Sequence, residues 1–222
     1  MTAAEVQSPP PGATQATRPG PAPGWVRLAW LYAASRRIPA ALGLTAGLSV
    51  LLWAALHWHW NISGGPAAQQ FIPLVIEIGT AAVIAVTTYG PFGEPEQATG
   101  RWLPYLRLAA AVLLTVAAVG LLCAGATGGS LPGGTLALLR NVAGATGIGL
   151  LAAAVVGGSL AWTGPMAYLL LAETALSESW TTPWAWPARP PHDTGAVICA
   201  ALAFGSGVAI TTVLGARRRL TE

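Results

Sequence analysis

The chain has 222 residues, of which 54% are hydrophobic and only 9% are charged. This composition excludes an ordinary soluble domain of this length, because the surface of such a domain needs more charge. The formal net charge of +3 comes from eleven arginines, and the chain contains no lysine. We expect these arginines to contact anionic lipid headgroups and to set the membrane topology, and we expect no binding to nucleic acid.

Two segments precede the first long apolar run. Residues 1–24 contain six prolines among Ala, Thr, Gln and Gly, without apolar periodicity. This composition predicts a disordered, Pro-rich cytoplasmic tail. A cleavable signal peptide is not expected, because no apolar run begins before residue 38. Residues 25–37 place aromatic and aliphatic side chains at helical spacing beside Arg27, Arg36 and Arg37, which predicts an amphipathic helix on the inner leaflet.

Six long apolar runs follow, within a predicted transmembrane domain of residues 38–219. Apolar helices of about 20 residues match the hydrocarbon core of a bilayer, which is about 30 Å thick. Membrane-spanning strands would be about half as long and would alternate polar with apolar residues. The sequence therefore predicts an all-α polytopic membrane protein with six transmembrane helices. The runs are 38–58, 71–89, 108–126, 136–157, 161–178 and 194–215.

The arginines are distributed unevenly around these runs. On an alternating path, nine of the eleven lie on one side of the membrane, and only Arg140 and Arg189 lie elsewhere. Because basic loops are retained in the cytoplasm, this bias predicts that both termini are cytoplasmic. We expect a multi-pass protein of the inner (plasma) membrane. The nine arginines are Arg18, Arg27, Arg36, Arg37, Arg101, Arg107, Arg217, Arg218 and Arg219.

The connection after the second run, residues 91–107, is the longest predicted cytoplasmic segment between spans. It combines charged and aromatic side chains, which suits a short surface helix that exposes charge to a partner. We take it as the candidate coupling element. Its candidate contact residues are Phe92, Glu94, Glu96, Arg101 and Trp102.

Ionisable residues inside the predicted spans form a second candidate site. Glu77, Arg140 and Glu173 lie at a similar depth in the outer third of runs two, four and five. A charge in a bilayer is costly and usually faces a partner, a cavity or water. We therefore expect Arg140 to pair with Glu77 or Glu173, with Asn141 taking part. This cluster either shapes an outward gate or locks the helices together.

Two further patterns concern packing and metal binding. Small residues recur at close-packing spacing at Gly43 and Gly47 and through the fourth run, which we expect to be the most tightly packed helix. His57 and His59 would point roughly 200° apart on one helix, so they cannot chelate one ion together unless the helix has ended before His59. The sequence predicts no metal site and no cofactor.

Motifs for an enzymatic reaction are missing from the sequence. Without lysine, the chain has no phosphate-binding loop ending in Gly-Lys-Ser/Thr, and it has neither a nucleophile elbow nor a zinc-protease helix. The chain is therefore not expected to be an enzyme by itself. Any use of ATP requires a second polypeptide.

The sequence resembles the small six-span permease subunits of ABC-2 type transporters from actinobacteria. The resemblance rests on three segments. They are the basic amphipathic segment 25–37 before the first run, the segment 89–96 (Tyr-Gly-Pro-Phe-Gly-Glu-Pro-Glu) and the start of the fourth run, 139–147. It implies an exporter subunit that works with a separate cytoplasmic ATPase docked on residues 91–107. It also implies a second permease copy or a related permease subunit.

Two other classes of function stay open at this point. The chain is alternatively a non-transport membrane anchor or sensor for a cytoplasmic partner. A haem or quinone redox protein would need histidines deeper in the spans than His57 and His59.

Overall fold

The computed structural model describes residues 34, 37–58, 66–87 and 103–214. These residues contain no β-strand, in agreement with the predicted all-α class. The predicted tail 1–24, nearly all of the helix predicted at 25–37, and residues 91–102 lie outside the described part of the chain. The helices are α2 (Ile38–His57), α3 (Pro66–Thr87), α5 (Leu103–Gly125), α6 (Gly134–Val156), α7 (Thr163–Ser177) and α8 (Thr194–Leu214), with two short 3₁₀ turns, η2 (Gly158–Leu160) and η3 (Trp186–Ala188).

Five of these helices, all except α7, are long and apolar enough to cross a membrane. Large apolar side chains such as Val50, Leu113 and Val213 are exposed on the outside of the bundle, as expected for helices surrounded by lipid. The chain is therefore a membrane-embedded helical protein. Helix α7 has only 15 residues, or about 22 Å, and is too short to cross the hydrocarbon core unaided.

The helix boundaries differ from the predicted runs at two places. Helix α3 begins at Pro66 instead of residue 71, because proline is well accommodated in the first turn of a helix, where its missing N–H has no intrahelical partner. Helix α5 begins at Leu103, so Arg107 lies within a helix and not in the connection predicted at 91–107. Farther along α3, Pro73 removes one backbone hydrogen bond within the helix.

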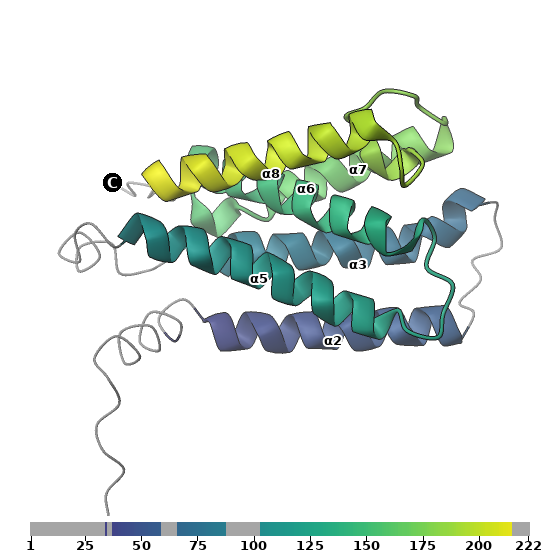
Figure 1. The fold of residues 1–222 in the computed structure, drawn as a ribbon, viewed down its shortest axis with the longest axis horizontal. Coiled ribbons are helices and arrows are strands. Elements are labelled where there is room, and N and C mark those ends of the chain that lie inside the picture. The colour runs from purple at the N-terminus through teal and green to yellow at the C-terminus, as the bar shows by residue number, and fades with distance from the viewer. Residues whose placement is uncertain (1–33, 35–36, 59–65, 88–102, 215–222) are drawn as a thin grey trace, which may run out of the picture.

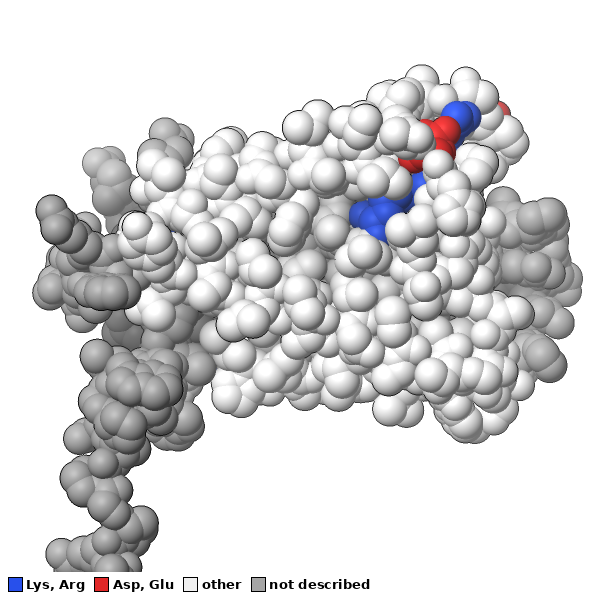
Figure 2. Space-filling model, in the orientation of Figure 1, with Lys and Arg blue, Asp and Glu red and all other residues white. Residues whose placement is uncertain are grey.

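The helices run along one axis of the molecule and alternate in direction (Figure 1). Helices α3, α6 and α8 begin at the end that holds the 126–133 turn and the 178–193 loop, which we call the polar end. On the face drawn in Figure 2, the visible charged side chains of the described residues gather toward this end. Residues at similar positions along the helices contact one another. Glu77 of α3 bonds to Asn141 of α6, and Thr211 of α8 bonds to the carbonyl of Leu150 of α6. Helix α6 is therefore parallel to both of its main neighbours.

Helix α6 lies at the centre of the bundle and packs against α3, α5, α7 and α8. Two glycines bring α6 and α8 into backbone contact, because a Cβ atom at Gly147 would overlap the main chain of Ala203, and one at Gly207 would overlap the carbonyl of Gly147. On another face, a Cβ at Gly149 would lie 2.5 Å from Ala85 of α3. The predicted close packing of this helix thus involves its glycines directly.

The other glycine pair singled out by the sequence behaves differently. Gly43 and Gly47 face outward from α2, and no atom lies within 4 Å of a Cβ built on either. Their spacing is the same as that of a packing motif, but no helix of the described residues packs against them. Spacing alone therefore does not identify which glycines make contacts.

We predict that Gly147→Ala destabilises the bundle, because the added methyl group must separate α6 from α8. Overpacking of this kind costs about 1–3 kcal/mol. Thermal unfolding of the detergent-purified protein should show a lower melting temperature. Gly120→Ala is the matched control, because a Cβ at Gly120 of α5 meets no atom within 4 Å. Equal melting temperatures for the two variants would contradict the assigned contact.

Candidate functional site

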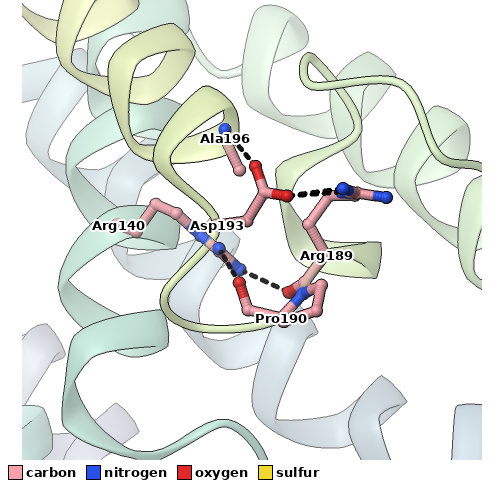
Figure 3. Close-up of polar contacts among 5 residues, drawn as sticks. All are labelled: Arg140, Arg189, Pro190, Asp193 and Ala196. Carbon is pink, nitrogen blue, oxygen red and sulfur yellow. Dashed lines mark hydrogen bonds and ion pairs between the residues drawn. The ribbon is translucent and has the colours of Figure 1, made fainter.

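Arg140 lies on the second turn of α6 and is only 4% exposed. Its guanidinium donates hydrogen bonds to two consecutive backbone carbonyls of the 178–193 loop, from Nη1 to Pro190 at 2.8 Å and from Nη2 to Arg189 at 3.0 Å (Figure 3). The structure therefore differs from the expected pairing of Arg140 with a carboxylate. A guanidinium presents several N–H donors in a fixed fork, which lets one side chain hold two adjacent carbonyl groups.

Glu77 of α3 is 3% exposed and bonds to the residue next to Arg140. Asn141 Nδ2 donates a 2.8 Å hydrogen bond to Glu77 Oε2. Consecutive residues of a helix point about 100° apart, so α6 directs Arg140 to the loop and Asn141 to α3. Among the described residues, neither Glu77 nor Glu173 forms an ion pair with Arg140.

The loop that receives Arg140 is also held at the start of α8. Asp193 precedes the first residue of α8, and its Oδ1 accepts a 2.8 Å hydrogen bond from the backbone N–H of Ala196. Its Oδ2 accepts a 3.0 Å bond from Arg189 Nε. The backbone N–H of Ala196 and, after it, the Arg189 side chain lower the pKa of Asp193 below its ordinary value of 3.8. The carboxylate thus acts as an N-terminal cap whose charge is paired.

An aromatic contact fixes the same loop from its other side. Trp186 of η3 is buried and stacks on Tyr168 of α7, with ring centroids 4.5 Å apart. Its ring occupies the space beside Gly144 of α6, where a Cβ would lie 2.6 Å from Trp186 Cζ2. Tyr168 in turn donates a 3.0 Å hydrogen bond to the carbonyl of Trp184. The loop is therefore packed into the bundle and does not merely cover its end.

A cavity of about 260 Å³ opens between α3, α6, α7 and this loop. Glu77, Arg140 and Asn141 all line it, together with Gln70 of α3. The remaining walls are largely apolar and contain several prolines. These other lining residues are Pro73, Leu74, Pro132, Gly133, Ala137, Leu176, Pro187, Ala188, Arg189, Pro190 and Pro191.

A second cavity of about 250 Å³ adjoins the first toward Trp180. Gln70, Leu176, Ala188 and Arg189 line both cavities. The two cavities therefore lie side by side at the polar end, one beside Glu77 and the other beside Trp180.

The other candidate residues lie apart from these cavities. Glu173 is exposed on α7 and is not among the residues that line either cavity. The coupling candidates Phe92, Glu94, Glu96, Arg101 and Trp102 all lie outside the described residues. Of the predicted cluster, the structure therefore brings together only Glu77, Arg140 and Asn141.

Sequence reasoning missed the loop residues that complete the site. Pro190 and Arg189 contribute backbone carbonyls, which no side-chain pattern reveals. Trp186 belongs to a loop rich in Trp and Pro, and its ring is buried in the core. Gln70 could have been found from the sequence, since it is polar and lies two turns before Glu77 on the same helix.

We predict that Arg140→Met loosens the 178–193 loop, because it removes two hydrogen bonds donated by a charged group. A cysteine introduced at Ala188, in a chain with Cys123→Ala and Cys199→Ala, reports the opening through its rate of maleimide labelling. The rate should rise about tenfold or more, since each such bond is worth about 1.5–3 kcal/mol. Glu173→Gln in the same background should leave the rate unchanged. An unchanged rate in Arg140→Met would show that other contacts hold the loop.

We also predict that the stabilising effect of Asp193 depends on pH. A carboxylate whose pKa is lowered by folding contributes stability above its ordinary pKa, and this contribution is lost as pH falls through the lower folded value. In the variant Asp193→Asn, the asparagine would still cap α8 but would carry no charge. The difference in melting temperature between the wild type and this variant should be constant from pH 7 to about pH 5 and should shrink below about pH 4. A difference that persists unchanged at pH 3 would refute the role of the charge.

In comparisons with known proteins, no protein-family model, no curated protein sequence and no solved structure matches the chain. Its function must therefore be inferred from its own residues.

Proposed function

We propose that the chain is the permease subunit of an ATP-driven transporter, an exporter of the ABC-2 type that works with a separate ATPase. The observation that carries this proposal is the cavity lined by Glu77, Arg140 and Asn141 inside a bundle of membrane-length helices. A simple anchor needs no polar cavity at membrane depth. Charged side chains that face the interior of a membrane bundle commonly mark a solute or ion pathway.

The proposed topology has six crossings, with both termini in the cytoplasm and the polar end outside. Helices α6 and α8 are parallel, so the chain between Val156 and Thr194 must return to the end at which α6 began. If α6 and α8 both cross the bilayer, residues 157–193 cross it in the opposite direction, with the segments that flank α7 extending this short helix. The arginines of the sequence favour the other end as the cytoplasmic one.

The proposed ATPase docks on the connection between α3 and α5. Helix α3 ends at Thr87 and α5 begins at Leu103, both at the end of the bundle away from the cavity. Because α3 also carries Glu77, tilting of α3 by the ATPase would move one wall of the cavity. Access to the cavity would then alternate as helices shift against one another. A second permease copy or a related subunit completes the proposed complex in the plasma membrane.

The test is copurification of the tagged full-length chain from its native membranes, followed by measurement of ATP hydrolysis in the eluate. We expect an ATPase subunit to copurify. The double variant Glu94→Ala, Glu96→Ala should lower both its recovery and ATP turnover by about tenfold, as expected when charged contacts at a docking site are lost.

A matched control is Glu178→Ala, which removes an acidic side chain from the loop at the polar end. It should leave ATP turnover unchanged. If no ATPase copurifies from native membranes, the transport proposal fails, and the alternative of a membrane anchor or sensor takes its place.

A further inference from the structure

We infer that the polar-end cavity binds a small zwitterion, with the ammonium group of the ligand at Glu77 and its carboxylate at Arg140. This site assignment concerns binding alone. The identification of the zwitterion as the transported solute rests on the proposed function.

The inference begins with how the two opposite charges are held. Glu77 accepts a hydrogen bond from a neutral amide, Asn141, and Arg140 donates to neutral carbonyls. Both groups are nearly fully buried and line the same cavity, yet no ion pair joins them in the described residues. Opposite charges at low dielectric attract strongly, so a fold that only needed to neutralise them would bring them into contact.

Two residues that line the cavity also have polar atoms without hydrogen-bond partners. Among the described residues, Arg140 Nε and Asn141 Oδ1 are buried and make no hydrogen bond. Glu77 Oε1 accepts no hydrogen bond there either, since the bond from Asn141 goes to Oε2. Buried polar groups are normally paired, and exceptions call for a specific explanation. A polar ligand between α3 and α6 provides one.

A zwitterion fits the charges of this site better than an ion of either sign. An ammonium ion alone would pair with Glu77 and would give Arg140 no partner in the cavity, and a simple anion would do the reverse. A ligand that carries both groups compensates both side chains and keeps the site electrically neutral. Burying an uncompensated charge is the costly alternative in a low-dielectric site.

The volume and the lining residues of the cavity indicate what kind of zwitterion would fit. Its volume of about 260 Å³ lies just below the range of about 300–1,000 Å³ typical of pockets for drug-sized ligands, so the ligand is a small metabolite. Pro73, Leu74 and Leu176 give the walls an apolar character. The adjoining cavity beside Trp180 offers room for an apolar side chain. A free amino acid with a neutral side chain has this chemistry.

The test measures binding to the purified full-length chain in lipid nanodiscs, by thermal melting and by isothermal titration calorimetry. The probes are alanine, leucine and phenylalanine. Each is compared with its amine-only analogue (ethylamine, 3-methylbutylamine and phenethylamine) and its carboxylate-only analogue (propionate, 4-methylpentanoate and 3-phenylpropanoate). We expect at least one zwitterion to raise the melting temperature, since a ligand that binds only the folded state stabilises it. Both analogues of that zwitterion should bind about 10- to 100-fold more weakly, the loss expected for one hydrogen bond to a charged group.

Two variants assign the binding to this cavity. Glu77→Gln removes the charge but can still accept the hydrogen bond from Asn141, and Arg140→Gln removes the positive charge. Each should weaken binding of the zwitterion by about 10- to 100-fold. The control Glu173→Gln makes the same chemical change on the exposed face of α7 and should bind as the wild type does. The comparison of analogues on the wild type stands even if a variant fails to fold.

The outcomes separate the inference from the proposed function, because binding is measured on the isolated chain without an ATPase. An amine-only or carboxylate-only analogue that binds as tightly as its zwitterion would overturn the inference in favour of a simple cation or anion site. Absence of binding by all three zwitterions would also overturn it. Zwitterion binding that is lost in Glu77→Gln would support it even if no ATPase copurifies.

Discussion

The backbone contact between α6 and α8 is the constraint on which the rest of the structure depends. Because Gly147 and Gly207 lack side chains, the two helices approach closely enough for α8 to begin beside the second turn of α6. The segment that leads into α8 then lies within reach of Arg140. A larger side chain at either glycine would separate the helices and move that segment away from the guanidinium. The polar contacts at one end of the bundle therefore rely on steric contacts nearer its middle.

Most of the fold could be predicted from hydropathy, because each apolar run became a helix close to its predicted bounds. The length of α7 was overestimated, since residues 161–162 form a turn and the helix spans only Thr163–Ser177. Within α6, the glycines pack as expected, whereas the similar pair at Gly43 and Gly47 contacts nothing. Local composition indicates that a helix can pack closely, but the partner surface is decided by the tertiary arrangement.

The candidate site could be predicted only in part, for a related reason. The expected depth in the membrane grouped Glu77 with Arg140, and the structure places both, together with Asn141, around one cavity. The same expectation included Glu173, which lies on the exposed face of α7. The partner of Arg140 could not be read from side-chain types, since it consists of two main-chain carbonyls at positions 189 and 190. Whether a loop reaches back to a helix depends on packing such as that of Trp186.

The parallel arrangement of α3, α6 and α8 has an electrostatic consequence of its own. Peptide dipoles sum along a helix, so each helix carries about half a positive elementary charge at its N-terminus. The amino ends of α3, α6 and α8 all lie at the polar end, but so do the carboxyl ends of α2, α5 and α7, so opposite partial charges lie side by side there. The acidic group that caps α8 benefits directly, as Asp193 does. The main chain therefore stabilises a negatively charged group at this end only where the group lies against the amino end of a helix.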